Sequence, residues 1–290
     1  PVSNRHVSSL AHSPTAKEVV GPRSIMPPYD TWTGADGSVY DRPTSPVDRE
    51  LYEAARLGRL ETVIKCIRNG GNVNEINRGM VGGSTCNVGW TSLHTACSNG
   101  SNYEVVRTIL DARANVNHIS FDKESPLDVA IFPIDPAARL EIVRLLVQSG
   151  ARPGPKYEGR FGGNLLVYIN AHSTTWRDKF SERPDRVEIA RIFLDAGFCQ
   201  VDQTEIDAST GRNTMVSALM AAAAAGYPSL VQFYLERGVN VTATDEHGND
   251  VMTWARREFR GYPANLQRNY REICKDGDPR LTKCIELIRN

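Results

Sequence analysis

One phrase of the sequence returns along the chain with small changes, and it limits the possible folds more than any other feature. Its clearest copy is Gly-Trp-Thr-Ser-Leu-His-Thr-Ala at residues 89–96, followed by an amphipathic stretch at residues 104–110. This order predicts a turn, a short helix and a second helix whose apolar face cannot be covered within the unit. Such units are stable only when they stack, so the phrase predicts an elongated array that presents a surface rather than a chemical pocket.

Six helix pairs are predicted in this way. The first helix of each pair begins with a large apolar residue and carries a small or apolar residue three positions later; the leading residues are Leu51, Leu93, Leu127, Leu166, Leu219 and Met252. The second helices, with apolar residues at i, i+3 and i+4, are predicted at 61–67, 104–110, 141–146, 188–194, 229–235 and 282–288. The steps from Leu93 to Leu127 and from Leu219 to Met252 are close to a period of about 33 residues, and the longer steps require insertions.

The segments that follow the second helices have a composition of their own. Most of these helices are followed by a glycine, which ends a helix in the left-handed conformation without a Cβ penalty; these are Gly70, Gly150, Gly197 and Gly238. An extended segment such as Asn115-Val116-Asn117 comes next. In these features, and most closely at residues 91–94 and 115–118, the sequence resembles the ankyrin-repeat family over about residues 47–290.

The resemblance implies an all-α solenoid of about six helical hairpins whose outermost units act as caps. The sequence departs from the family pattern at several positions. Arg113 stands where the helix-ending glycine is expected, so we expect a distorted turn or another geometry there. Val167, Met220 and Thr253 stand at the position that His94 occupies in the best copy.

Residues 1–46 differ from the rest and are predicted to form an extended arm in front of a solenoid at 47–290. Seven prolines interrupt this segment, so it can form no core of its own. Tyr29, Trp32 and Tyr40 are candidate anchors, because rigid aromatic side chains contribute much contact area for little entropy. Two readings stay open: the anchors hold the arm on another chain, or they fold back as a cap on the first repeat.

Further aromatic residues lie in the segments that join successive helix pairs. Trp90, Phe121, Tyr157 and Phe161 stand outside the helical stripes, where core packing does not explain them. Exposed aromatic residues are typical of the energetic centre of a protein interface. We therefore take these four as candidate partner-binding residues, with local packing against the next segment as the alternative.

The sequence offers little support for catalysis or for a cofactor. His94 and Cys97 lie one helical turn apart, but no orienting group or oxyanion hole can be assigned to them. The resemblance implies instead that His94 makes a hydrogen bond beside Thr91 that ties the turn. No Cys/His spacing suits zinc and no phosphate-binding glycine fingerprint is present, so we expect neither a metal nor a cofactor, and no enzymatic activity.

Nucleic acid and membrane partners are also disfavoured. Arg256, Arg257 and Arg260 form a basic cluster that can be read as an RNA-binding patch, but acidic residues dilute it and a solvated helix face explains it as well. The chain carries 34 basic and 34 acidic residues, and no apolar run reaches the roughly 18 residues of a membrane span. The six cysteines show no paired spacing and are read as reduced, buried residues.

These observations lead to two hypotheses of function. In the first, the chain is a non-enzymatic scaffold or structural subunit that binds other protein chains through its concave face, its loops and its arm. We expect a cytoplasmic location, with cytoskeletal or ciliary assemblies as settings and an organelle interior such as the mitochondrion as the alternative. In the second, the chain is a regulatory or inhibitory module that binds a specific enzyme or transcription factor.

Overall fold

A computed structural model describes eleven stretches of the chain. They are residues 32–33, 39–40, 45–77, 88–99, 103–131, 136–155, 165–171, 185–206, 213–258, 260–261 and 274–290. The chain divides into two compact units, Pro1–Pro43 and Thr44–Asn290, close to the boundary that the sequence predicts between 46 and 47. In the first unit, strands β1 (Trp32–Thr33) and β2 (Val39–Tyr40) pair antiparallel, with Trp32 opposite Tyr40.

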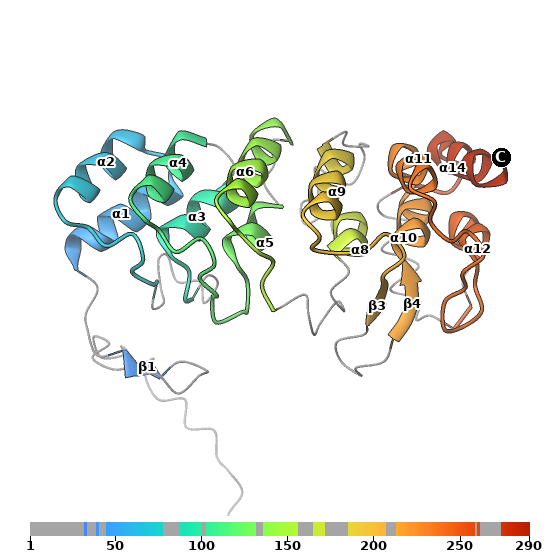
Figure 1. Cartoon of the computed structure of the whole chain (residues 1–290), viewed down its shortest axis with the longest axis horizontal. Coiled ribbons are helices and arrows are strands. Elements are labelled where there is room, and N and C mark those ends of the chain that lie inside the picture. Colours follow the sequence, from blue (N-terminus) through green and yellow to red (C-terminus); the bar gives the residue numbers. More distant parts are fainter. Residues whose placement is uncertain are drawn as a thin grey trace, which may run out of the picture. The chain divides into compact units, whose positions relative to one another are not determined.

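The second unit contains six pairs of helices in its described residues. The first members, which we call inner helices, are α1 (Pro46–Arg56), α3 (Ser92–Asn99), α5 (Pro126–Ala130), α8 (Leu165–Ala171), α10 (Ala218–Ala225) and α12 (Val251–Arg256). The second members, the outer helices, are α2 (Leu60–Arg68), α4 (Tyr103–Asp111), α6 (Pro136–Gln148), α9 (Asp185–Asp195), α11 (Pro228–Glu236) and α14 (Pro279–Arg289). Figure 1 shows the two kinds of helix in separate rows. The predicted all-α stack is confirmed.

We use the word finger for the segment that leads from an outer helix to the next inner helix. Figure 1 shows the fingers on the same side of the helix rows. The finger between α9 and α10 contains the strands β3 (Thr204–Ile206) and β4 (Asn213–Ser217), which pair antiparallel with Thr204 opposite Ser217. Glu246 of the next finger donates its backbone N–H to the carbonyl of Thr214 at 2.9 Å, so neighbouring fingers are joined through their backbones.

Side-chain caps explain where several inner helices begin. Ser125 accepts a hydrogen bond from the backbone of Asp128, whose carboxylate in turn accepts from the backbone of Ser125, so α5 starts with a capping box. Ser217 caps α10 in the same way by accepting from the Met220 backbone at 3.3 Å. Asp250 caps α12 by accepting from the Thr253 backbone at 2.7 Å.

The end of α4 corrects one expectation. Arg113 adopts the left-handed conformation with φ 65°, like the glycine Gly70 at the end of α2 with φ 82°. Its backbone N–H bonds to the carbonyl of Leu110 at 2.9 Å, and Ala114 bonds to Ile109 at 3.3 Å. The same hydrogen-bonding pattern closes α2, so the turn is not distorted. The hydrogen bonds of the helix end outweigh the steric cost of the arginine Cβ.

We therefore expect Arg113→Gly to stabilise the protein. Glycine removes the left-handed penalty of roughly 1 kcal/mol but loses more entropy on folding, which leaves a gain of about 0.5 kcal/mol. Urea unfolding measures the difference. The reverse change, Gly70→Arg, should lower stability by a similar amount, because no atom lies within 4 Å of a Cβ built there. A destabilised Arg113→Gly protein would show that this account of the turn is wrong.

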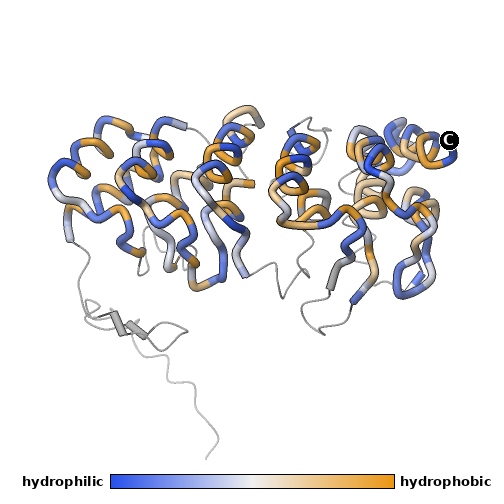
Figure 2. Tube along the Cα trace, viewed as in Figure 1, coloured by the Kyte–Doolittle hydropathy of each residue, from blue (hydrophilic) through white to orange (hydrophobic). Residues whose placement is uncertain are grey.

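The core lies between the helix rows and between successive pairs. All the residues of α5 and of α10 are buried, and so are residues 92–97 of α3. Figure 2 shows hydrophilic and hydrophobic residues alternating along the outer helices, as expected for amphipathic helices with one solvated face. Among the described residues, no helix is both long and apolar enough to cross a membrane.

Asparagine side chains join the fingers of successive units. Asn74 donates to the carbonyl of Arg113 at 3.3 Å and accepts from the backbone N–H of Asn115 at 2.6 Å. One unit later, Asn117 donates to the carbonyl of Gly150 at 3.0 Å and accepts from Arg152 at 2.7 Å. Each asparagine thus satisfies the backbone groups that the end of the next outer helix leaves open.

Candidate partner-binding surface

The distribution of exposed apolar residues singles out the fingers. Four large apolar residues of the described chain are exposed: Leu57 at 44%, Ile119 at 39%, Met215 at 46% and Val241 at 40%. Ile119, Met215 and Val241 lie in fingers, whereas Leu57 follows α1 in the turn toward α2. Because the inner helices α5 and α10 are buried throughout, they offer a partner few side chains. Three of the four exposed large apolar residues of the described chain therefore lie in fingers.

Met215 has an unusual backbone for an apolar residue. It stands two residues before the N-cap of α10 with φ 57°, and the residue two positions before the N-cap of α12 is Gly248 with φ 78°. The finger before α5 has Lys123 at this place, with φ 61°. Only glycine takes this conformation without cost. Met215 thus combines a strained backbone with an exposed side chain.

Two predicted partner-binding residues, Trp90 and Phe121, come together with histidines in one cluster. Trp90 is only 7% exposed and stacks on His94, with ring centroids 5.8 Å apart. His118 of the next finger meets His94 edge-on at 5.6 Å. Phe121 covers Gly89 so closely that a Cβ built there would lie 2.7 Å from its ring. This is the arrangement of the local-packing alternative, and a contact of either residue with a partner stays a prediction.

The structure says little about the other predicted binding residues. Trp32 and Tyr40 are partners in the backbone register of the β1–β2 pair of the first unit. Tyr29, Tyr157 and Phe161 lie outside the described residues. Their role in binding a partner stays a prediction.

His94 has the turn-tying role that the family resemblance implies. Its Nδ1 accepts from the Thr91 backbone at 3.3 Å and lies 3.0 Å from the Thr91 hydroxyl. Since the backbone N–H can only donate, the ring proton is on Nε2, which donates to the carbonyl of Glu124 at 3.1 Å. Burial lowers the pKa of His94 to about 3, and burial raises the pKa of the Cys97 thiol. Neither group is ready to act as a base or a nucleophile near neutral pH.

Asp128 occupies in α5 the place that His94 occupies in α3. Its Oδ2 accepts from the backbone of Ser125 at 2.7 Å and from that of Gly154, in the next finger, at 2.8 Å. Its Oδ1 is buried without a hydrogen-bond partner in the described part of the chain. Burial raises the pKa of Asp128 to about 7, although the two backbone hydrogen bonds act in the opposite direction.

This raised pKa predicts that Asp128→Asn changes the pH dependence of stability. The carboxyl of the folded protein binds a proton up to about pH 7, whereas in the unfolded chain it ionises near pH 3.8. Stability from this group is therefore lost as the pH rises between these values, by at most ~4 kcal/mol. We expect the unfolding free energy of Asp128→Asn to rise relative to wild type from pH 4 to pH 8.

Urea unfolding at several pH values tests this expectation, with Asp122→Asn as the control at an exposed residue of the same finger. The comparison with wild type is needed because His94 acts in the opposite sense. Its lowered pKa means that stability is lost as the pH falls below 6.5, in the wild type and the variants alike. Parallel curves for wild type and Asp128→Asn would contradict the prediction.

The basic cluster at the end of α12 is not a continuous surface. Arg257 is buried and donates to the carbonyl of Ala224 from Nε at 3.0 Å and from Nη2 at 2.7 Å. Its Nη1 donates to the carbonyl of Cys274 and lies 3.3 Å from the carboxylate of Asp276. Its charge is thus used inside the fold and is not part of an exposed basic surface.

Two more buried arginines were not foreseen from the sequence. Arg139 donates to the carbonyl of Ile131 at 3.0 Å, and Arg186 donates to the carbonyl of Ile169. Each bond joins the end of an inner helix to its own outer helix, and so closes the base of an insertion in that pair. Arg257 stands at the start of the segment that leads from α12 to α14.

The described residues contain no group of three or more His, Cys, Asp or Glu side chains that could hold a metal ion. The described cysteines are buried and in no disulfide, as the sequence analysis predicts; they are Cys66, Cys97, Cys199, Cys274 and Cys284.

The comparisons with known proteins agree with this architecture. A family model described as ankyrin repeats in three copies matches residues 51–157, and a model of a single ankyrin repeat matches residues 216–246. Residues 51–157 and 216–246 thus consist of ankyrin repeats, which are generally protein–protein interaction modules. The pair α8–α9 lies between the two matched regions. No curated protein matches the sequence.

Several solved structures share the fold. One is a chain from the Bd0816 predatory endopeptidase of Bdellovibrio bacteriovorus in complex with the immunity protein Bd3460; it is 18% identical, with a TM-score of 0.53 over 81% of this chain and 100% of that chain. The human ASB11 ankyrin repeat domain is 20% identical, with a TM-score of 0.51 over 80% and 85%. The ankyrin repeat protein EF0377 is 21% identical, with a TM-score of 0.51 over 79% and 96%.

Proposed function

We propose that this chain is a non-enzymatic scaffold that binds another protein chain along its fingers, as a subunit of a larger assembly. The observation that carries the proposal is the gathering of exposed apolar residues, Ile119, Met215 and Val241, in the fingers. Apolar residues at the centre of a polar rim are what a specific protein interface requires. The burial of His94 and Cys97 supports a role without chemistry of its own.

The backbone of Met215 supports the same proposal. A glycine in its place would avoid the left-handed penalty, as Gly89 and Gly248 do in other fingers. Strained residues that persist tend to lie at functional sites. Methionine also adapts its shape readily to an apolar pocket of a partner. We therefore place Met215 at the centre of the proposed interface.

Replacement of the apolar finger residues by serine tests the proposal. The variant Ile119→Ser/Met215→Ser/Val241→Ser should lose at least tenfold in affinity for the partner that the wild-type chain binds, with its melting temperature within a few degrees of wild type. Leu57→Ser is the matched control, since Leu57 is equally exposed but lies outside the fingers. Equal affinities of the triple variant and the control would contradict the proposal.

The second candidate function is an inhibitory module that binds one specific enzyme. It is supported by the fold likeness to a chain from a complex of an endopeptidase with an immunity protein, although the likeness itself concerns the fold alone. Limited proteolysis separates the two functions. A scaffold subunit should have residues 1–46 protected inside its assembly and cleaved in the isolated chain. An inhibitor that binds through its fingers should leave these residues open to the protease in both states.

For the scaffold, we propose cytoskeletal, ciliary or organellar assemblies as settings.

A further inference from the structure

The junction between the third and fourth helix pairs is built differently from the other junctions of the stack. Elsewhere, neighbouring inner helices pack directly on each other: α1 on α3, α3 on α5, α8 on α10 and α10 on α12. The helices α5 and α8 do not form such a close pair, and the contact between these units passes mainly through the outer helices α6 and α9. This junction also falls where the matched ankyrin repeats stop, after residue 157.

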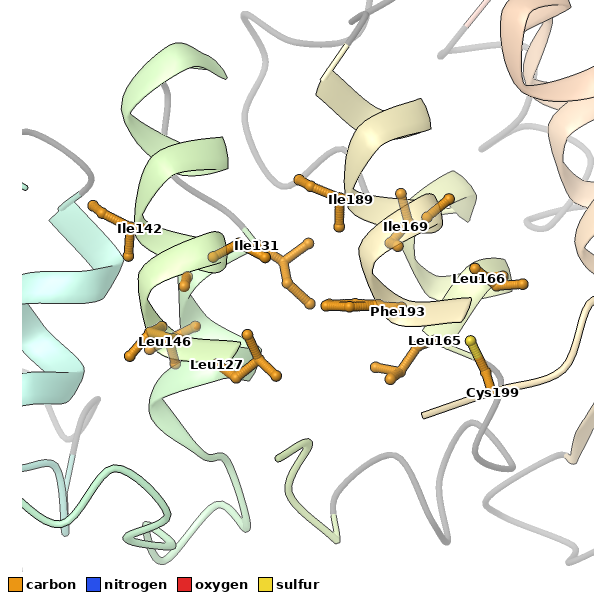
Figure 3. Close-up of a cluster of buried hydrophobic side chains, with 14 of the residues drawn as sticks. Leu127, Ile131, Ile142, Leu146, Leu165, Leu166, Ile169, Ile189, Phe193 and Cys199 are labelled. Carbon is orange, nitrogen blue, oxygen red and sulfur yellow. The ribbon is translucent and has the colours of Figure 1, made fainter. Parts of the chain in front are cut away.

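Apolar side chains fill part of this junction. Figure 3 shows Phe193 pointing from α9 toward Leu127 and Ile131 of the third pair, with Leu165 of α8 below it. All four side chains are buried. A charge buried beside such apolar side chains needs a partner.

A buried ion pair stands beside this cluster. Arg139 of α6 and Asp185 at the start of α9 are each about 5% exposed, and Arg139 Nε donates to Asp185 Oδ2 at 2.6 Å. A second nitrogen of the guanidinium donates to the same oxygen, and Nη1 donates to the Ile131 carbonyl at 3.0 Å. On the solvent side, Arg144 and Glu188 form an exposed pair at 3.4 Å. Two ion pairs thus link α6 to α9.

The buried pair makes this contact conditional. Removal of one member leaves the other charge buried and unpaired, which is strongly unfavourable, whereas replacement of both members by apolar residues is often neutral. Apolar packing between inner helices does not require two particular groups at once, because the loss of one methyl group weakens the contact only in part. The link between α6 and α9 therefore depends on the Arg139 guanidinium and the Asp185 carboxylate being present together.

Within each half of the stack, the links do not depend on this pair. Asn74 and Asn117 join the fingers of the first three units. In the second half, the guanidinium of Arg186 lies 4.7 Å from the ring centroid of Tyr227, and Asp202 accepts from the backbone of Asn240 at 2.8 Å. Each half is thus held together by contacts of its own.

We propose that the α6–α9 junction is a conformational joint in the stack, latched by the Arg139–Asp185 pair. With the pair intact, the helix pairs of residues 45–155 and of 165–290 open together as one cooperative unit. With the pair broken, the two blocks open separately and change their orientation to each other. A solenoid with such a joint can adjust the spacing between the finger before α5 and the finger before α10 without unfolding either block.

Hydrogen exchange of the full chain in increasing urea tests the joint. In the wild type, the core amides of α4 and α11 should become exchangeable at the same urea concentration. In Arg139→Met, their protection factors should differ by at least tenfold at intermediate urea, because each block then opens independently. The double variant Arg139→Met/Asp185→Leu should restore coincident opening, since it leaves no unpaired charge.

Arg186→Met is the matched control. It removes another buried arginine, but one whose contacts lie within the second block. Because the Arg139–Asp185 pair stays intact, the core amides of α4 and α11 should lose protection together and still become exchangeable at the same urea concentration. Coincident opening of both blocks in Arg139→Met would overturn the proposal. If that variant does not fold, Asp185→Asn, which keeps the shape of the side chain but leaves the Arg139 charge unpaired, should show the same separation; coincident opening there would overturn the proposal too.

Discussion

Arg257→Met should lower the free energy of unfolding by about 3–5 kcal/mol, the range expected when a buried charged group with several hydrogen bonds is removed. The guanidinium satisfies the carbonyls of Ala224 and Cys274, which belong to the end of α10 and to the segment before α14. Methionine fills much of the volume of the arginine side chain but cannot donate a hydrogen bond. The carbonyls of Ala224 and Cys274 are then left without this donor in the core. Urea unfolding followed by circular dichroism measures the loss.

The neighbouring Arg256 provides the control for this prediction. Arg256 is exposed and lies in the same basic cluster, so Arg256→Met should change stability by no more than about 0.5 kcal/mol. If the two substitutions cost the same, the burial and hydrogen bonds of Arg257 do not hold α10 to the last helix pair. If Arg257→Met instead costs less than 1 kcal/mol, the two carbonyls must find other donors.

Gly89→Ala should be the second most damaging change, with a loss of roughly 2–4 kcal/mol. Two causes add at this position. Gly89 has φ 81°, which alone costs an alanine about 1 kcal/mol. A Cβ at Gly89 would also lie 2.7 Å from the ring of Phe121 and 2.8 Å from its backbone nitrogen, and backbone cannot move away as a flexible side chain can. The His118 bond to the Gly89 carbonyl, 3.1 Å long, would be disturbed as well.

Gly248→Ala separates the two causes. Gly248 occupies the equivalent place in the finger before α12, with φ 78°, and no atom lies within 4 Å of a Cβ built there. The Gly248→Ala variant should therefore lose only the stability that the left-handed backbone costs an alanine, about 1 kcal/mol. Thermal unfolding of the two variants side by side gives the difference. Similar losses at Gly89 and Gly248 would mean that Phe121 does not pack on the finger as described.

The helix pairs could be predicted from the sequence because their signals are local. The apolar spacing of residues 104–110 and 229–235 is a property of each helix alone, and the structure places α4 and α11 there. The glycine stops at Gly70 and Gly238 are local too. The expectation for Arg113 was wrong because it weighed only the Cβ penalty, whereas the hydrogen bonds that close the helix end decide the conformation.

The contacts between units could not be predicted in the same way. Arginine is usually exposed, so nothing local indicates that Arg139 or Arg186 is buried; their partners lie on elements that only the fold brings near. The edge-on contact of His94 with His118 of the next finger could not be predicted either, because the sequence does not show which residues of neighbouring fingers meet. Asp128 follows Leu127 as His94 follows Leu93, but the sequence analysis names only Val167, Met220 and Thr253 at this position and leaves out the third unit.

The proposed interface was foreseen only in part. The sequence predicts binding through the concave face, the loops and the arm at residues 1–46, with aromatic residues as anchors. The structure leaves the aliphatic residues Ile119 and Val241 and the thioether of Met215 exposed in the fingers instead. Exposure of an aliphatic residue depends on whether the neighbouring finger covers it, and spacing along the chain does not reveal this.

Site-specific photocrosslinking of the full chain in its native cellular extract tests the central claim most directly. A benzophenone amino acid placed at Ile119, Met215 or Val241 should form a crosslink to the same partner protein from each of the three fingers. The same group at Lys65 or Lys283, on the exposed faces of the outer helices α2 and α14, should form none. Crosslinks from the outer helices together with silent fingers would contradict the claim that this chain binds its partner along the fingers.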